Sequence, residues 1–165
     1  APEELAARMN QQHWDEGEEA RRRYVTAIFL RLDPVKGELE IVNAGHNPGF
    51  VLHPDGSRCE FESSGTPLGL LPGMQYTTQS CPFPPGSRLL FYTDGLTESF
   101  RGEEEFGSDR LWDTFSACDL TNADGILDAL WTAIESFVED GPQGDDMTAL
   151  VLCREAKNAV VEPAA

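Results

Sequence analysis

Residues 88–93 constrain the fold of this chain more than any other segment. They read Arg-Leu-Leu-Phe-Tyr-Thr, a near-continuous apolar run of the kind that forms a buried central strand. Asp94 and Gly95 follow at once and are expected to end the strand. The segment therefore predicts a carboxylate at one end of a core strand.

Shorter β segments precede this strand. Alternating apolar residues predict strands at residues 24–32 and 38–43, and the Asp-Pro-Val-Lys-Gly stretch between them predicts a turn. A second hairpin is expected at residues 49–53 and 57–62, on either side of the turn residues Pro54, Asp55 and Gly56. With a further strand at residues 75–81, these segments predict an antiparallel meander.

Helical spacing marks two other segments. Leu5 and Met9 predict an N-terminal helix over residues 2–13. The most regular pattern places apolar side chains on one face between residues 126 and 138, with Asn122 as the N-cap and Gly141-Pro142 as the end of the helix. A last strand is predicted at residues 147–154, and residues 156–165 are expected to be a disordered tail.

Length and charge limit the classes of protein to consider. A chain of 165 residues with 40% hydrophobic residues can bury one ordinary core, so we expect a single domain over residues 1–155. Asp and Glu outnumber Lys and Arg by 29 to 12, and the net charge of -17 argues against nucleic acid as a partner. Ordinary solvated surfaces also carry such an excess, so the charge alone does not indicate a cation site.

Cysteine spacing and hydropathy add two expectations. The four cysteines form no C-x-x-C pair, so neither a zinc ribbon nor a disulfide framework is predicted, and buried reduced thiols are expected. The first residues lack a basic region followed by an apolar stretch, and no apolar run reaches the roughly 18 residues needed to span a membrane. The chain is therefore expected to be cytoplasmic, without membrane contact by this segment.

Two aspartate sites each adjoin a predicted core strand. Asp94 follows the strand at residues 88–93, and Asp145 and Asp146 precede the strand at residues 147–154. If these strands are antiparallel neighbours, the carboxylates meet at one edge of the sheet. Oxygen ligands without a suitably spaced His or Cys favour Mg²⁺ or Mn²⁺ over zinc. The alternative is that the two segments are an ordinary turn and an ordinary loop.

Four motifs in a fixed order favour the metal site over that alternative. They are Asn-Ala-Gly-His-Asn-Pro at residues 43–48, Gly-Thr-Pro-Leu-Gly-Leu at 65–70, Tyr-Thr-Asp-Gly-Leu-Thr-Glu at 92–98 and Asp-Asp-Met-Thr at 145–148. The series resembles the SpoIIE and RsbU branch of the type-2C (PPM) protein phosphatases, over roughly residues 2–154. The resemblance implies an α+β fold, a PPM-type α-β-β-α sandwich of two antiparallel sheets with flanking helices.

The resemblance also implies a site and an activity. By this match Asp94 and Asp145 are catalytic metal ligands, Asp146 binds metal through water or orients its neighbour, and Gly95 belongs to the same metal-site motif. Two Mn²⁺ or Mg²⁺ ions in the complete domain would direct a water at a phosphoserine or phosphothreonine. The implied substrate and partner is a phosphorylated anti-sigma-factor antagonist of bacterial partner-switching signalling.

The chain departs from the family pattern at its start. The family's Gly-Asp strand and Asp-x-Ser-Gly-His-Gly turn, which carry further metal-binding aspartates, have no counterpart in the sequence. We therefore expect an N-terminally incomplete domain that lacks its N-terminal third, is inactive alone, and exposes sheet edges through which a homodimer can form. The alternative function is a degenerate, non-catalytic phosphatase-like module that binds a regulatory protein.

Other residues of the motifs have two interpretations. His46 is expected to bond the loop backbone together with Asn47, and the alternative is that it positions phosphate. Glu98 either enters the outer metal shell or begins a short helix. Four glycines are expected to be turn residues with unusual φ values: Gly45, Gly65, Gly69 and Gly95.

Overall fold

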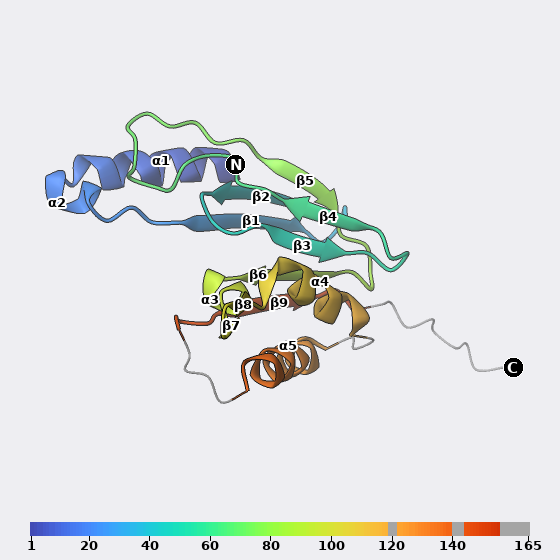
Figure 1. The fold of residues 1–165 in the computed structure, drawn as a ribbon. Helices are drawn as coiled ribbons and strands as arrows, with labels where there is room; N and C mark the ends of the chain where they lie inside the picture. The colour runs from blue at the N-terminus through green and yellow to red at the C-terminus, as the bar shows by residue number, and fades with distance from the viewer. Residues whose placement is uncertain (119–121, 140–143, 156–165) are drawn as a thin grey trace, which may run out of the picture.

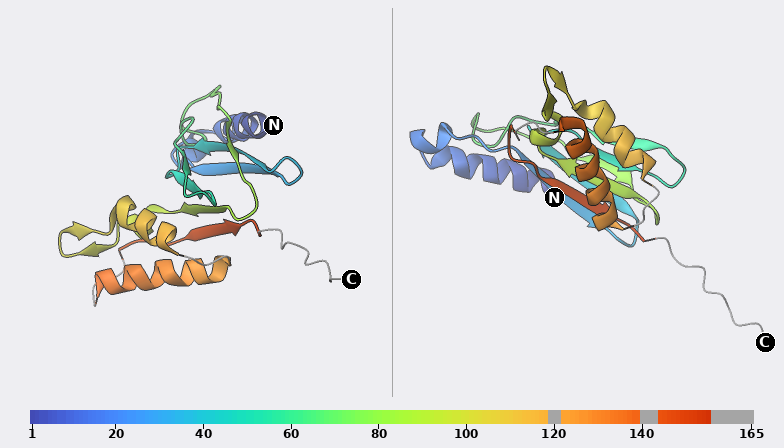
Figure 2. Two further views of the ribbon diagram at one scale, coloured as in Figure 1. Left: turned by 90° about the vertical axis from the view of Figure 1, so that its right-hand side faces the viewer. Right: turned by 60° about the horizontal axis from the view of Figure 1, so that its bottom comes forward.

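Two antiparallel sheets pack face to face, and helices cover both outer faces (Figure 1, Figure 2). Helix α1 (Pro2–Asp15) lies over the three-stranded sheet, whereas α4 (Gly107–Ala117) and α5 (Ala123–Val138) lie over the four-stranded sheet. This computed structural model describes residues 1–118, 122–139 and 144–155. The layers confirm the predicted α-β-β-α sandwich; the predicted tail at 156–165 and the Gly141-Pro142 helix end lie outside the described residues.

The strands divide between the sheets in an order that the sequence did not predict. One sheet has the order β1 (Ala27–Asp33), β2 (Glu38–Ala44), β5 (Gln79–Pro82), and the other has β4 (Arg58–Phe61), β3 (Gly49–Leu52), β6 (Arg88–Tyr92), β9 (Ala149–Cys153). Both predicted hairpins are confirmed. The predicted meander is wrong, because residues 45–48 carry the chain from one sheet to the other between β2 and β3.

The apolar run at residues 88–93 is the central strand β6, as predicted, and it lies between β3 and β9. Successive side chains of a strand point to opposite faces. Leu89 and Phe91 pack between the two sheets, while Leu90 and Tyr92 pack against the helices. Because β6 has a core on each face, its sequence is apolar at every position rather than at alternate ones.

Helices α4 and α5 close the outer face of the four-stranded sheet. The side chain of Asn122 accepts a hydrogen bond from the backbone N–H of Gly125 (2.7 Å), which confirms the predicted N-cap of α5. Four apolar side chains of the predicted helical face are buried in this layer together with two residues of α4: Ile126, Leu130, Ile134 and Phe137, with Leu111 and Phe115. The aromatic residues of these helices therefore serve packing.

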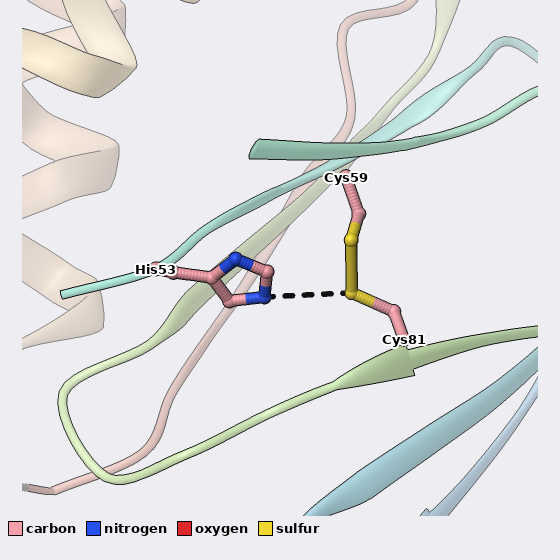
Figure 3. A group of neighbouring side chains, drawn as sticks. All are labelled: His53, Cys59 and Cys81. Atoms are coloured by element: carbon pink, nitrogen blue, oxygen red, sulfur yellow. Dashed lines mark hydrogen bonds between the residues drawn. A yellow bond between two sulfur atoms is a disulfide. The ribbon is translucent and has the colours of Figure 1, made fainter. Parts of the chain in front are cut away.

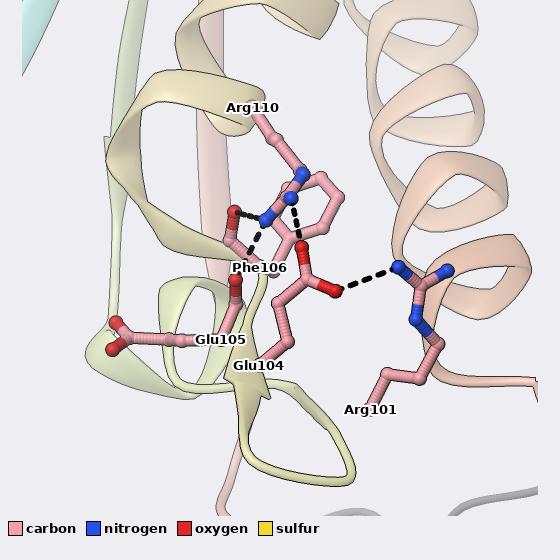
Figure 4. A network of polar contacts seen from close by, with 5 residues as sticks. All are labelled: Arg101, Glu104, Glu105, Phe106 and Arg110. Atoms are coloured by element: carbon pink, nitrogen blue, oxygen red, sulfur yellow. Dashed lines mark hydrogen bonds and ion pairs between the residues drawn. The ribbon is translucent and has the colours of Figure 1, made fainter.

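A short hairpin of β7 (Phe100–Arg101) and β8 (Glu104–Glu105) is pinned to both helices (Figure 4). Glu104 pairs with Arg101 and Arg110, and Arg110 also donates to the backbone oxygen of Glu105 (2.7 Å). Both guanidinium groups lie over the ring of Phe137, 4.5 and 4.8 Å from its centroid. The network ties the segment that follows Asp94 to α5.

Helix α1 is held by polar as well as apolar contacts. Asn10 is fully buried; its Oδ1 accepts from the N–H of Gly69 (2.9 Å), and its Nδ2 donates to the carbonyl of Leu71 (3.0 Å). This network holds an irregular segment, so the strand predicted from residue 75 begins only at Gln79. The segment between α1 and β1 contains a short helix, α2 (Glu18–Arg21).

The prediction of reduced thiols is wrong for two of the four cysteines. Cys59 on β4 and Cys81 on β5 form a disulfide that joins the two sheets. The pairing depends on how the sheets pack, which the spacing of cysteines along the chain does not encode. Cys118 and Cys153 are free and half-buried. Across the described ranges we find no helix with the length and apolar character to cross a bilayer.

Candidate metal centre

Strands β6 and β9 are antiparallel neighbours, and this confirms the premise of the predicted metal site. Their register ends at the pair Tyr92 and Ala149. The pairing extends further, because the N–H of Thr93 donates to the carbonyl of Thr148 (2.9 Å) and the N–H of Thr148 donates to Thr93 Oγ1 (2.9 Å). Residues 94 and 145–146 consequently lie at the same end of this strand pair, where β6 ends and β9 begins.

The two acidic segments touch at this end, which we call the acidic mouth (Asp94, Gly95, Asp145 and Asp146). A Cβ atom on Gly95 would lie 2.5 Å from the backbone oxygen of Asp146, so only glycine fits there. Thr93 Oγ1 also donates to that Asp146 oxygen (3.1 Å). Gly95 is thus required by close approach of the backbone. The predicted unusual φ is wrong for Gly95 and Gly65 and correct for Gly45 and Gly69.

Asp94 begins a short helix, α3 (Asp94–Thr97), immediately after β6. The carbonyl of Asp94 accepts the N–H of Glu98 (2.7 Å), so Glu98 ends this helix, and the expectation that it begins one is wrong. Leu96 carries α3 into the core beneath α4, and Ser99 donates to the carbonyl of Gly95 (2.9 Å). The side chains of all three aspartates of the mouth are exposed.

The carboxylates of the mouth are adjacent but not gathered around one point. Asp145 Oδ1 accepts the N–H of Asp146 (2.7 Å), which fixes one of the two neighbouring side chains. In the part of the chain that the structure describes, the one group of three His, Cys, Asp or Glu ligand atoms within 4.8 Å of one another is His53, Cys59 and Cys81. The mouth therefore offers three carboxylates without a ready-made three-ligand cage.

The loop of residues 45–47 forms the opposite wall of the mouth. Half-buried His46 lies near enough to Asp94 for the two charges to interact: burial lowers the pKa of His46, and the Asp94 carboxylate opposes that shift. The backbone of this loop is bonded by Asn43, which is fully buried; its Nδ2 donates to the carbonyls of His46 (3.1 Å) and Asn47 (3.2 Å). Hydrogen bonding of the loop backbone was predicted for the side chains of His46 and Asn47. The side chain of Asn43 performs it instead.

A groove of about 410 Å³ leads from this wall along the two sheets. It runs between edge strands β1 and β9, and its lining includes Ile28, Leu30, His46, Thr93 and Leu150. Leu30 and Leu150 are exposed by 38% and 55%, which is high for leucines on strands. The mouth therefore continues into an apolar channel between β1 and β9, whose outer edges pair with no further strand among the described residues.

Comparison with known proteins adds the family to this geometry. A family model described as Stage II sporulation protein E (SpoIIE) matches residues 1–155. The chain belongs to the SpoIIE family. Protein IcfG of Synechocystis sp. is 32% identical over 132 residues, or 79% of this chain, and the phosphoserine phosphatase RsbP of Bacillus subtilis is 30% identical over 83 residues, or 50% of it. The chain spans 21% of the length of each of these curated relatives.

Solved structures of this family have the same fold. The phosphatase domain of the cell fate determinant SpoIIE from Bacillus subtilis, from crystals presoaked in manganese, matches with a TM-score of 0.68 at 17% identity. The match covers 100% of this chain and 73% of that chain. At this identity the likeness shows the fold alone, and it confirms the predicted arrangement of two antiparallel sheets with flanking helices.

Proposed function

We propose that this chain is part of a metal-dependent protein serine/threonine phosphatase and that the acidic mouth is its metal site. The observation that carries the proposal is the register of β6 with β9, which brings residues 94–95 against residues 145–146. Membership of the SpoIIE family and the relative named phosphoserine phosphatase RsbP support the same reaction. The reaction is the hydrolysis of phosphoserine or phosphothreonine.

The donors of the mouth fit a hard divalent cation. All are carboxylates on two loops in contact, and hard, strongly hydrated ions such as Mn²⁺ and Mg²⁺ prefer such oxygen ligands. Asp94 and Asp145 would bind the metal directly, Asp146 would bind through water or orient its neighbour, and Gly95 would let the two loops meet. When bound, a pair of such ions lowers the pKa of a water and neutralises phosphoryl oxygens.

The substrate proposed here is a phosphorylated anti-sigma-factor antagonist in the cytoplasm. A net charge of -17 repels a phosphoprotein at long range, so recognition would rest on local docking rather than on broad attraction. The apolar groove between β1 and β9 opens beside the mouth and gives such docking a surface. We expect faster hydrolysis of the intact phosphoprotein than of a short phosphopeptide with the same sequence.

One observation favours a second function, a non-catalytic module that binds a regulatory protein. The three carboxylates of the mouth do not gather within 4.8 Å of one another as a metal cage would. The exposed apolar edges of β1 and β9 also suit a contact with a regulatory protein, and a homodimer of the incomplete domain could use the same edges. Both proposed functions use the same mouth and groove, but only the phosphatase requires a metal ion at the mouth. A measurement of metal binding therefore distinguishes the two functions.

Calorimetric titration with Mn²⁺ tests the proposal. Asp94→Asn and Asp145→Asn should each weaken binding by about tenfold or more, since a hard-cation site does not readily replace a carboxylate with water. Asp113→Asn, an exposed aspartate on α4, is the matched control and should leave the affinity unchanged. Equal affinity in both mouth variants and the control would exclude the mouth as the metal site and favour the binding module.

A further inference from the structure

A second cluster of reactive side chains lies away from the acidic mouth. The disulfide between Cys59 and Cys81 joins β4 of one sheet to β5 of the other, across 22 residues of sequence and a Cα–Cα distance of 6.7 Å. His53 Nε2 lies 3.5 Å from Cys81 Sγ (Figure 3). The three side chains form a single cluster, with their nitrogen and sulfur atoms within 4.8 Å of one another.

The hydrogen bonds of His53 fix the direction of its protons. Nε2 lies 2.9 Å from the carbonyl oxygen of Pro82, which only accepts, so Nε2 carries a hydrogen and donates it to this oxygen, with the Cys81 sulfur 3.5 Å away. Nδ1 lies 2.9 Å from Ser57 Oγ, whose own hydrogen goes to Asp55 Oδ1 (2.6 Å). Both ring nitrogens are therefore engaged by neighbouring oxygen atoms. An N–H donor thus stands next to the Cys81 sulfur.

The two sulfur atoms differ in access. Cys81 is 1% exposed, whereas Cys59 is half-buried on edge strand β4. An attacking thiolate reaches the more accessible sulfur, and exchange is faster when the departing sulfur is stabilised as a thiolate. Cys59 is the accessible sulfur, and Cys81 is the one beside the His53 donor. The geometry assigns the attacked role to the first and the leaving role to the second.

We propose that the Cys59–Cys81 bond is a reversible redox cross-link between the two sheets, opened by a small dithiol and assisted by His53. A thiolate of the dithiol attacks Cys59 Sγ, the S–S bond breaks, and its electron pair goes to Cys81 Sγ, which His53 Nε2–H stabilises. The second thiol of the dithiol, once deprotonated, then releases Cys59 as a thiolate and leaves as a cyclic disulfide. The dithiol is oxidised by two electrons and the protein disulfide is reduced.

The cross-link acts at the end of the sandwich opposite to the mouth. His53 follows Leu52, which pairs with Arg88 at the start of β6, and Asp94 lies beyond the other end of that strand. Opening the bond therefore frees β4 from β5 without touching the aspartates. A bond closing a loop of this size should give the oxidised form a Tm roughly 6 to 12 °C higher than that of the reduced form.

A thiolate–imidazole metal site is the competing use of the same three side chains. Soft thiolates with a neutral imidazole suit zinc. Both ring nitrogens of His53 are already bonded, to Pro82 and Ser57, so the imidazole has no free lone pair to offer. The contacts favour the redox cross-link, and the experiment includes zinc as a separate arm.

The test uses the full chain with Cys118→Ser and Cys153→Ser, so that only the cross-linked pair reacts. The native protein is equilibrated with mixtures of reduced and oxidised dithiothreitol, free thiols are alkylated, and the mass and Tm are measured. We expect a reversible two-electron transition with a Tm rise of roughly 6 to 12 °C on oxidation. Brief exposure to reduced glutathione should trap a mixed disulfide on Cys59, identified by peptide mass.

Removal of the imidazole tests its assisting role. His53→Gln should slow native-state reduction by roughly three- to tenfold, because the departing Cys81 thiolate loses its donor. His13→Gln, which removes an imidazole bonded to the Arg23 carbonyl far from the cysteines, should not change the rate. A rate unchanged in both variants, or a mixed disulfide on Cys81, would refute the assigned roles.

Two results would overturn the cross-link itself. The first is that the Cys59–Cys81 bond does not respond reversibly in the folded protein. Either both cysteines remain free thiols, and are alkylated, in the most oxidising mixture, or the disulfide is reduced only after the protein unfolds. The second is that the reduced protein binds one Zn²⁺ and that this binding raises its Tm as much as oxidation does. Cys59→Ser would abolish the zinc binding. That result would make the cluster a metal site.

Discussion

The two helical layers of the sandwich are built in different ways. On the four-stranded sheet, α4 and α5 bury a large apolar core that includes Leu111, Phe115 and Leu130. On the three-stranded sheet, α1 buries a smaller set that includes Ala6, and a buried amide, Asn10, makes two hydrogen bonds to residues distant in the sequence. The first layer depends on the area of apolar surface removed from water, and the second depends on a few directed hydrogen bonds.

This difference matters because the acidic mouth stands on the apolar layer. Asp94 begins α3, and Leu96 of α3 is buried in the same core as α4 and α5. His46, on the opposite wall, follows β2, whose outer face is covered by α1. One wall of the mouth therefore belongs to the layer held by apolar packing, and the other belongs to the layer held by a polar network.

The largest effect is expected from truncating the apolar layer. Phe115 is fully buried at the centre of the α4–α5 core, so Phe115→Ala should lower the free energy of unfolding by about 3–5 kcal/mol. Phe100→Ala is the matched control, since Phe100 is 48% exposed on β7, and should cost less than about 1 kcal/mol. Urea denaturation measures both. Similar losses in the two variants would contradict the assignment of stability to this core.

A smaller but sharper effect is expected in the polar layer. Asn10→Leu fills the same space but leaves the N–H of Gly69 and the carbonyl of Leu71 without their partner, which should cost about 1–3 kcal/mol. Hydrogen exchange at Gly69 should rise in this variant. Gln12→Leu, at an exposed position of the same helix, is the control and should change neither quantity. An Asn10→Leu protein as stable as the native one would show that α1 is held by packing after all.

The junction of the mouth should respond to a single methyl group. Gly95→Ala places a Cβ 2.5 Å from the Asp146 carbonyl, so the two acidic loops must separate, at a net cost of about 1–2 kcal/mol in unfolding free energy. Weaker Mn²⁺ binding should accompany this loss. At Gly144 a Cβ meets nothing within 4 Å and φ is not in the left-handed region, so Gly144→Ala is the matched control. Equal Mn²⁺ affinity in the two variants would show that the close contact is not needed for metal binding.

Local patterns in the sequence were enough to predict most elements and one long-range contact. The run at residues 88–93 and the strand near residue 150 were predicted as neighbours, and their register confirms it. The helical face from Ile126 with its Asn122 cap was also predictable, because period and capping are encoded within a few residues. Two acidic segments were therefore placed at one sheet edge without a structure.

What could not be predicted depends on packing between distant segments. The Cys59–Cys81 bond requires β4 and β5 to face each other across the two sheets, and Asn10 finds its partners about 60 residues away, at Gly69 and Leu71. Asn43 belongs to a motif that the sequence shows. The sequence does not show that Asn43 is buried at the end of β2, and its role in bonding the loop of residues 45–47 depends on that burial. Buried amides in motifs are therefore worth examining as loop organisers before histidines are.

The smallest effect concerns the start of α1 and depends on pH. Thr78 donates a hydrogen bond to the Glu3 carboxylate, and this bond, aided by the backbone N–H of Glu3, lowers the pKa of Glu3 below its ordinary value of 4.5. A carboxyl whose pKa is lower in the folded state stabilises the fold above pH 4.5, and that contribution is lost as the pH falls through the folded pKa. Glu3→Gln and Thr78→Val should each remove the same part of the acid-induced loss of stability, and the double variant should remove no more.

The free energy of unfolding of each variant is measured by denaturation between about pH 3 and pH 7, a range that brackets the usual carboxyl pKa. Parallel curves for the native protein and Glu3→Gln would mean that the Thr78 contact contributes nothing to holding α1, which leaves the polar part of that layer to Asn10 and to the Gln11 side chain that accepts the N–H of Gly73.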